Sequence, residues 1–444
     1  MEKNKHDSPD EEKVDRISNL PESIRNHIVS FLPMVDAIRT SVLSKSWRNV
    51  CSSLSNLVFD QQLFDEMSGF KDSVSQLIDH RDGSNVQVFK LVVDVDDSII
   101  PHIHAWISYV VQHNVEKLYL IAQSRKLDSL PCSLFTSRTL TVLYLCDIHL
   151  ELPAVVEFPL VKFLHLRWVQ WSDVSQTNQL ISNCPMLEVL VIAYCSWHKF
   201  DVLVISCPKL KMLVVKSARS LQEVKISCPN LYECRYHGYP PDISSETLSS
   251  LLLATLHFFP SEDFQDWQNG MPQRVTKIFM ELHNVLHLVL EEFALASLSK
   301  NRDLFANIQI QLCSITFLEL DVISMENQVQ FVASLLSIFP NLQIFHVFFK
   351  EPCPLASFLN LEGHYQPQIS SDLGALKGIT IKGLKGNDIE LYLVRHLLEK
   401  AKGLLDMEIS YSRDLDENEP RRSVIGKKIE QFVKASRNAI ISFA

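Results

Sequence analysis

Three versions of one phrase stand close together in the middle of the chain. CPMLEVLVI begins at Cys184, CPKLKMLVV at Cys207 and CPNLYECRY at Cys228. FPLVKFLHL, from Phe158, and FPNLQIFHV, from Phe339, are variants of the same phrase. Proline next to the start favours a turn, and the apolar alternation that follows favours a short strand with one buried face. Five copies in one chain predict a repeated structural unit rather than isolated strands.

The spacing of the repeat identifies its type. The pattern L-x-x-L-x-L, with apolar substitutes, recurs with first members 27, 25, 21, 26, 23 and 21 residues apart. These first members are Val88, Val115, Leu140, Val161, Leu187, Leu210 and Leu231. A period of about 20–29 residues with this pattern is typical of leucine-rich repeats, in which each unit adds one strand to a parallel sheet. The sequence therefore predicts an α/β fold with a leucine-rich-repeat solenoid over residues 85–364.

The spacing becomes looser after residue 240. Strands are predicted around Leu288, Leu318 and Phe345, roughly thirty residues apart, which leaves room for a longer helix in each unit. Residues 260–275 and 350–372 are predicted to be exposed loops, because they are rich in Pro, Gly and polar residues.

Residues 365–444 show a strand–helix alternation. A strand at 379–381 precedes a helical stripe over 389–401, with Asn387 or Asp388 as its N-cap. A strand at 405–409, a charged loop at 412–422, an amphipathic helix over 425–433 and a strand at 439–443 follow. An open stack of repeats needs an atypical terminal unit. This block is therefore predicted to be a βα cap.

The N-terminal region has a different organisation. Residues 1–15 are charged and are predicted to be a disordered leader. Residues 16–60 are predicted to form three short helices, with Pro21 in the first turn of the first helix and Ser44 capping the third. About forty residues rarely make a self-sufficient core, so the apolar excess here predicts a partner surface. Packing on the first repeats as an N-terminal cap is the alternative.

Composition and charge exclude several classes of function. Glycine is scarce, at 11 residues, and neither G-x-G-x-x-G nor G-x-x-x-x-G-K-[ST] occurs, which argues against nucleotide binding. A formal charge of −10 argues against a general nucleic-acid binder. The chain starts with a charged stretch, and its most apolar run, Leu248 to Phe259, is too short for a membrane span. The ten scattered cysteines favour buried free thiols and hence a location in the cytoplasm or nucleus.

The sequence gives little support for a metal-binding or catalytic site. Cys195 and His198 near Cys184 and Cys207 fit no standard zinc spacing, and the Cys-Pro cysteines are explained by the repeat. His287 lies in an alternating run, where a half-buried strand histidine is the simpler interpretation. No H-E-x-x-H or G-x-S-x-G occurs, so no cofactor, no metal and no catalytic residue are predicted. The basic residues around 421–428 are interpreted as a solvated helix face rather than a nuclear-import signal.

Two segments carry a family resemblance. DRISNLPESIRNHIVSFLPMVDAIRTSVLSKSWRNV, residues 15–50, resembles an F-box of the plant type, although Ser46 stands where that family usually has Arg. ITIKGLKGNDIELYLVRHLLEKAKGLLDMEI and IEQFVKASRNAIISF, in residues 379–443, resemble the FBD module of plant F-box/leucine-rich-repeat proteins. With the repeats between them, the resemblance covers about nine tenths of the chain.

The resemblance implies a function and partners. It implies a non-catalytic substrate adaptor of a cullin–RING ubiquitin ligase, whose F-box binds a Skp-type adaptor and whose repeats hold an unknown target protein. A leucine-rich-repeat scaffold or decoy is the alternative, and an enzyme has no positive support in the sequence. The residues expected to bind the adaptor are Leu20, Pro21, Ile24, Ile28, Phe31, Leu32, Pro33, Val42, Leu43 and Trp47.

Overall fold

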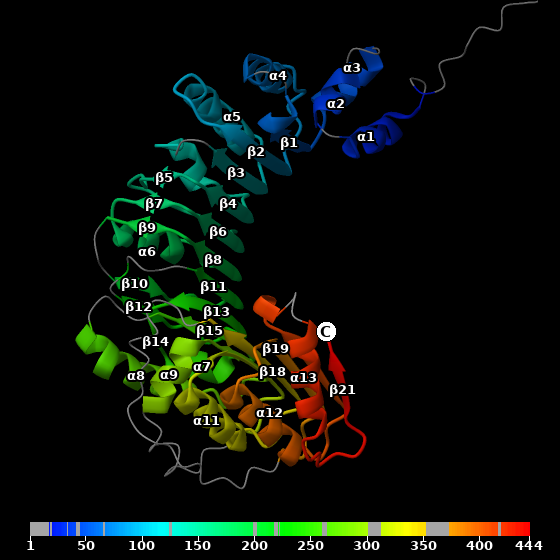
Figure 1. Cartoon of the computed structure of the whole chain (residues 1–444). Helices are drawn as coiled ribbons and strands as arrows, with labels where there is room; N and C mark the ends of the chain where they lie inside the picture. Colours follow the sequence, from blue (N-terminus) through cyan, green and yellow to red (C-terminus); the bar gives the residue numbers. More distant parts are fainter. Residues whose placement is uncertain are drawn as a thin grey trace, which may run out of the picture. The chain divides into compact units, whose positions relative to one another are not determined.

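A computed structural model describes residues 17, 20–32, 34–40, 45–64, 67–123, 127–198, 202–216, 221, 223–259, 264–300, 312–351, 373–415 and 419–444 (Figure 1). The chain divides into two compact units, residues 1–161 and residues 162–444. Each unit contains parallel strands with helices, and the predicted α/β class with a parallel sheet is confirmed. No helix in the described part of the chain is long and apolar enough to span a membrane.

Unit 1 begins with three short helices and continues into a parallel sheet. The helices are α1 (Glu22–Ser30), α2 (Met34–Thr40) and α3 (Lys45–Ser52). Strands β1 (Asn56–Asp60), β2 (Val88–Asp94), β3 (Lys117–Gln123) and β4 (Val142–Cys146) then pair in chain order, all parallel. The remaining elements are η1 (Gln61–Leu63), α4 (Met67–Asp79), α5 (Ile100–Gln112), η2 (Cys132–Thr136) and β5 (His149–Leu150).

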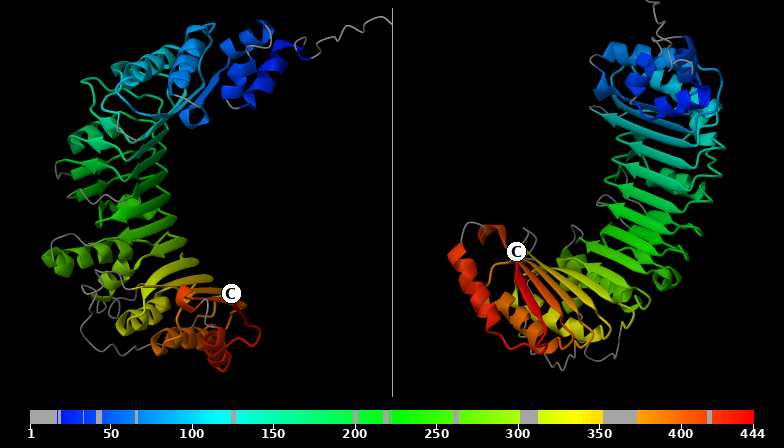
Figure 2. Two further views of the ribbon diagram at one scale, coloured as in Figure 1. Left: turned by 45° about the horizontal axis from the view of Figure 1, so that its top comes forward. Right: turned by 90° about the vertical axis from the view of Figure 1, so that its right-hand side faces the viewer.

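Unit 2 has a longer parallel sheet, with its helices on one face (Figure 2). The strands in spatial order are β6 (Phe163–Arg167), β8 (Val189–Ala193), β11 (Met212–Lys216), β13 (Glu233–Gly238), β15 (Leu253–Phe258), β16 (His287–Leu290), β17 (Phe317–Ile323), β18 (Ile344–Lys350), β19 (Gly378–Leu384), β20 (Asp406–Tyr411) and β21 (Ile440–Phe443). In strands such as β15 and β16, buried residues alternate with residues that face outward on the opposite side of the sheet. We call the second, outward surface the open face.

Short return elements connect the unit 2 strands. The helices are α6 (Val174–Ser182), α7 (Ser245–Ser250), α8 (Phe264–Met280), α9 (Glu292–Lys300), α11 (Glu326–Leu335), α12 (Asp388–Lys400) and α13 (Glu419–Glu430), with η3 (Leu336–Ile338) and η5 (Arg413–Leu415). Two short pairings run behind the main sheet: β7 (Gln170–Trp171) with β9 (Ser196–Trp197), and β10 (Val202–Ile205) with β12 (Glu223–Ile226) and β14 (Asp242–Ile243).

The repeated phrase is a turn that starts each strand. In CPMLEVLVI the Leu187 N–H donates to the Cys184 carbonyl at 3.1 Å, and the Cys207 and Cys228 copies form the same bond at 3.2 and 3.0 Å. This is the closing bond of a β-turn, and Pro at its second position fixes the backbone angle φ that the turn requires. The bond also forms where the proline is absent, as from Val285 to Leu282 at 3.4 Å. After residue 240 the sequence of the phrase is less regular, but the turn before the strand has the same geometry.

The cysteines of the phrase form a buried row of free thiols. Cys184, Cys207 and Cys228 are buried, and burial raises the pKa of each; the pKa of Cys184 and of Cys207 rises to about 12. None of the nine described cysteines is in a disulfide, and among them Cys132 and Cys313 are exposed.

We expect alkylation at pH 8 to distinguish the exposed cysteines from the buried ones. Cys132 and Cys313 should react quickly in the folded protein, whereas the buried thiols should react only as the protein unfolds, because they are rarely deprotonated and reagents cannot reach them. Mass spectrometry of alkylated peptides over time measures this. In denatured protein all ten cysteines should be modified; protected disulfides there would contradict the interpretation as free thiols.

Two of the predicted loops are helical. Helix α8 (Phe264–Met280) occupies most of the loop predicted at 260–275, with Pro272 inside it. Proline removes only one helical N–H, and burial of Met271, Val275 and Ile278 holds the helix despite that loss. Helix α13 likewise begins at Glu419, within the predicted loop at 412–422. The predicted loop at 350–372 lies almost wholly outside the described residues.

The final strand–helix alternation is as predicted, and Asn387 is the N-cap of α12. Its side chain accepts from the Glu390 N–H at 2.8 Å. The Glu390 carboxylate is fully buried and accepts from the N–H groups of Lys385 and Gly386 at 2.7 and 2.8 Å. It also accepts from the Ser324 hydroxyl, which ties α12 to the end of β17. A single carboxylate thus satisfies several buried donors.

Substitution of Glu390 should be costly. Glu390→Ala leaves these donors without a partner, and we expect the free energy of unfolding to fall by about 3 kcal/mol. Urea unfolding followed by circular dichroism measures the change. Glu399→Ala, an exposed glutamate on the same helix, serves as the control and should change stability little. Equal stability of the two variants would contradict the role assigned to Glu390.

Candidate functional site

The three N-terminal helices share a small core. Val29, Ala37, Trp47 and Val50 are each at most 4% exposed. The Cys51 thiol, also buried, donates to the Ala37 carbonyl at 3.0 Å and joins α3 to α2. One face of each helix is thereby used to hold the other two.

Helix α1 keeps a second apolar face outside this core. Ile24 and Ile28 are 45% and 38% exposed, and Phe31 is 74% exposed. The four-residue spacing of the two isoleucines places them on one side of the helix, and Phe31 follows one turn later. We use the name docking surface for Leu20, Pro21, Ile24, Ile28, Phe31 and Leu32. An apolar cluster of this kind on a short domain is typical of a protein-binding surface.

The residues predicted to bind an adaptor fall into three groups. The docking surface contains six of them: Leu20 is half-buried, whereas Pro21, Ile24, Ile28, Phe31 and Leu32 are exposed. Trp47 is 4% exposed, so it supports the helices from within and offers no surface for contact. Pro33, Val42 and Leu43 lie outside the described residues.

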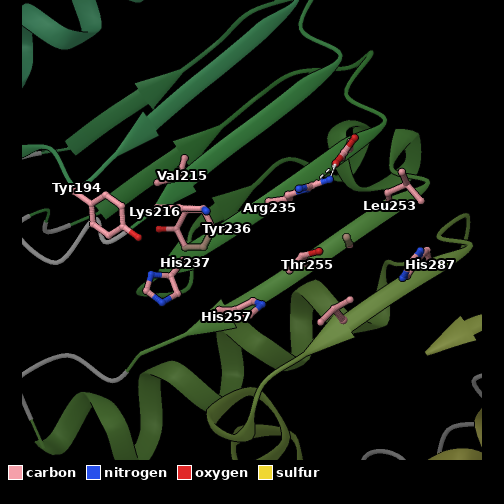
Figure 3. A pocket seen from close by; sticks show the side chains of 13 residues that line it. Tyr194, Val215, Lys216, Arg235, Tyr236, His237, Leu253, Thr255, His257 and His287 are labelled. Carbon is pink, nitrogen blue, oxygen red and sulfur yellow. Dashed lines mark hydrogen bonds and ion pairs between the residues drawn. The ribbon is translucent and has the colours of Figure 1, made fainter. Parts of the chain in front are cut away.

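A second candidate site lies on the open face of unit 2. An open pocket of about 490 Å³ is formed there by strands β11 to β16 and by Tyr194 (Figure 3). Its charged and polar lining consists of Tyr194, Lys216, Glu233, Arg235, Tyr236, His237, Thr255, His257 and His287, with Val215, Leu253, Ala254 and Val289 between them.

Several charged groups of the pocket already have partners. Arg235 donates to the Glu233 carboxylate from Nε and Nη2, both at 2.7 Å. His257 contacts the Glu291 carboxylate through Nδ1. The His287 ring lies 3.8 Å from the Phe317 ring, and burial lowers the pKa of His287.

Sequence reasoning did not find this pocket. Its residues span almost a hundred positions and come from strands that the parallel register brings side by side. The available signal was the outward position of each strand, where polar and charged residues alternate with the buried ones. For His287 the prediction of a half-buried strand histidine is confirmed.

The residues considered as zinc ligands make other contacts. The buried Cys195 thiol lies 3.5 Å from the Leu166 carbonyl, and the His198 ring lies 2.9 Å from the Gln170 amide nitrogen. In the described part of the chain, no three His, Cys, Asp or Glu side chains are placed to hold a metal ion.

Two protein-family models match different parts of the chain. Residues 17–59 match the family model of the F-box domain. Residues 103–253 match the model described as FBD-associated F-box protein At5g56370, LRR repeats.

Relatives in Arabidopsis thaliana have the same combination. The chain is 32% identical to F-box/LRR-repeat protein 13 over 197 residues, covering 43% of this chain and 44% of the relative. It is 30% identical to F-box/LRR-repeat protein At4g14096 over 308 residues, covering 65% and 64%. It is 32% identical to FBD-associated F-box protein At3g52670 over 237 residues, covering 52% and 56%. The chain thus spans about half to two thirds of the length of these relatives. Over part of its length the chain is therefore similar to plant F-box/leucine-rich-repeat proteins, including FBD-associated ones.

Proposed function

We propose that the chain is the substrate-recognition subunit of an SCF-type cullin–RING ubiquitin ligase, without catalytic activity of its own. In this proposal the F-box (residues 16–60) binds a Skp-type adaptor and, through it, the cullin and RING subunits. The repeats (85–364), closed by the FBD cap (365–444), hold the target protein. The complex acts in the cytoplasm or the nucleus.

The exposed docking surface carries this proposal. F-box domains in general bind Skp-type adaptors, and here Ile24, Ile28 and Phe31 leave a large apolar area uncovered on α1. Burial of such anchors at the centre of an interface dominates the free energy of binding. The fully buried Trp47 and Val50 keep the helices together while this face is presented.

The mechanism that follows is proximity. A target held on the open face of the sheet shares one complex with the charged carrier enzyme, so its lysines meet the carrier at a high effective concentration. No reactive group of this chain is needed.

Isothermal titration calorimetry with a purified Skp-type adaptor tests the first step. We expect the intact chain to bind one adaptor and a chain lacking residues 1–60 to bind none. Absence of binding by the intact, folded chain would contradict the proposal. Binding of the adaptor without ubiquitin transfer would favour a scaffold or decoy.

A further inference from the structure

The sheet of unit 2 has an outermost strand that pairs on one side. In the described part of the chain β21 (Ile440–Phe443) pairs with β20 alone and lies at the edge of the sheet (Figure 1). The Ile440 N–H donates to the Leu405 carbonyl of that pairing at 2.9 Å. Successive residues of a parallel strand point to opposite neighbours, so the N–H and C=O groups of Ile441 and Phe443 point away from β20. These backbone groups are placed to pair with one further strand.

The side chains at this edge are apolar and exposed. Ile440 is 70% exposed on the open face, and Val433, between α13 and the strand, is 71% exposed. On the helix side the Phe443 ring stacks on the Tyr411 ring, with the ring centres 6.1 Å apart, and Phe443 is still 36% exposed. Exposed apolar side chains beside outward-pointing backbone groups are typical of an edge that accepts an added strand.

Two unpaired carboxylates lie one strand in from the edge. Asp406 and Glu408 are exposed on the open face of β20. The residues beside them on β19 are Gly378 and Thr380, which carry no charge. Among the described residues, no basic side chain forms an ion pair with either carboxylate. The two carboxylates are two positions apart, which is the period at which side chains of an extended segment project from one face.

The register defines what an added strand needs. Ile440 lies beside Asp406 and Ser442 beside Glu408, so an added strand would continue these two rows on the open face. Its backbone would be about 9–10 Å from that of β20, two strand spacings away, which a lysine or arginine side chain can cross. The small Ser442 leaves the way to Glu408 open, and a methylene stem over Ile440 would cover that exposed side chain. The intervening residues would face Phe443 and need to be apolar.

Charge favours a different protein over a second copy of this chain as the occupant. A second β21 would place only isoleucine and serine on the open face, so Asp406 and Glu408 would stay unpaired. Two copies with a formal charge of −10 each also repel one another. A basic segment is instead attracted by the same carboxylates.

We propose that the edge of β21 binds an extended segment of a partner protein in which Lys or Arg alternates with apolar residues. The backbone of the segment pairs with Ile441 and Phe443, its basic side chains bind Asp406 and Glu408, and its apolar side chains cover the Phe443 ring. This surface belongs to unit 2, outside the docking surface, and the inference is independent of the proposed ligase function.

Calorimetry with the full chain and three capped heptapeptides tests the proposal. The peptides are TVKVKVT, TVEVEVT and TVKKVVT, of which the last has the composition of the first without its alternation. We expect TVKVKVT to bind about tenfold or more tightly than the other two, because it alone matches both the carboxylates and the period of a strand. Hydrogen exchange measured by mass spectrometry should become slower in residues 440–443 when this peptide is bound.

Variants locate the binding. Glu408→Lys should weaken TVKVKVT binding by about tenfold and strengthen TVEVEVT binding, because the charge at the edge is reversed. Ile441→Pro removes an outward N–H that β20 does not use and should abolish binding, whereas Ile441→Ala keeps this donor and should retain it. Glu246→Lys is the matched control, because Glu246 is an exposed carboxylate on α7 and its substitution should leave the affinity unchanged.

Several results would overturn the assignment. Equal binding of the three peptides, or no binding of TVKVKVT, excludes an alternating basic segment as the ligand. Unchanged affinity in Glu408→Lys, or binding without slower exchange in residues 440–443, places the ligand elsewhere. A dimer of the free chain in light scattering that Ile441→Pro dissociates would assign the edge to a second copy. Adaptor capture by Glu408→Lys should equal that of the unmodified chain, so a failure here is distinguishable from a failure of the F-box assignment.

Discussion

The double variant Ile24→Asp, Ile28→Asp is expected to lose capture of a Skp-type adaptor completely while the chain stays folded. Both side chains are exposed in the free chain, at 45% and 38%, and neither belongs to the buried core of the three helices, so we expect the helices to stay folded. In the complex each aspartate would be a buried, unpaired charge. Loss of a buried anchor costs about 2–4 kcal/mol of binding free energy, and two such losses abolish a micromolar complex.

Controls for this variant lie on the same unit. Leu63→Asp changes another exposed apolar residue, 57% exposed and outside the docking surface, and should leave adaptor capture intact. Val29→Ala, inside the helical core, should instead lower the stability of the helices. Retained capture by the double variant at the level of Leu63→Asp would mean that the adaptor binds elsewhere.

Deletion of residues 373–444 is expected to make the protein aggregate. The deletion removes β19, which pairs along β18, and α12, which packs on α11. Strand β18, IFHVFFK, would then be an uncovered edge with unpaired N–H and C=O groups and little charge. Such an edge is a template for pairing with other chains.

Light scattering after gel filtration measures this effect. Removal of residues 2–15 is the control, and that shorter chain should remain monomeric. A monomeric, soluble chain after deletion of 373–444 would contradict the interpretation of these residues as a cap and would favour an independent domain.

Local sequence periodicity was sufficient for most of the sheet. The repeated turn phrase locates strands such as β8 and β11 because the buried position and the turn proline have fixed spacing. Strand β15 (Leu253–Phe258) was missed because its turn lacks the phrase, although its apolar run was visible. Helix α8 was missed because Pro272 and Gly270 were interpreted as loop residues, whereas tertiary burial outweighs their local preference.

The sites were less accessible from sequence than the fold. Helical spacing located the apolar face of α1, but it could not separate exposed Phe31 from buried Trp47, because both are aromatic residues in the same motif. The pocket on the open face depends on the register of β11, β13, β15 and β16, which brings together residues that span almost a hundred positions of the chain.

Ubiquitin transfer in a reconstituted complex tests the central claim most directly. Proteins captured from a plant extract by the intact chain, with the endogenous ligase inhibited, are incubated with Skp-type adaptor, cullin, RING subunit, carrier enzyme and ubiquitin. The proposal predicts that captured proteins are modified with the intact chain and are captured but not modified with the Ile24→Asp, Ile28→Asp variant. Equal modification with both chains, or none with the intact chain although the adaptor is bound, would contradict it.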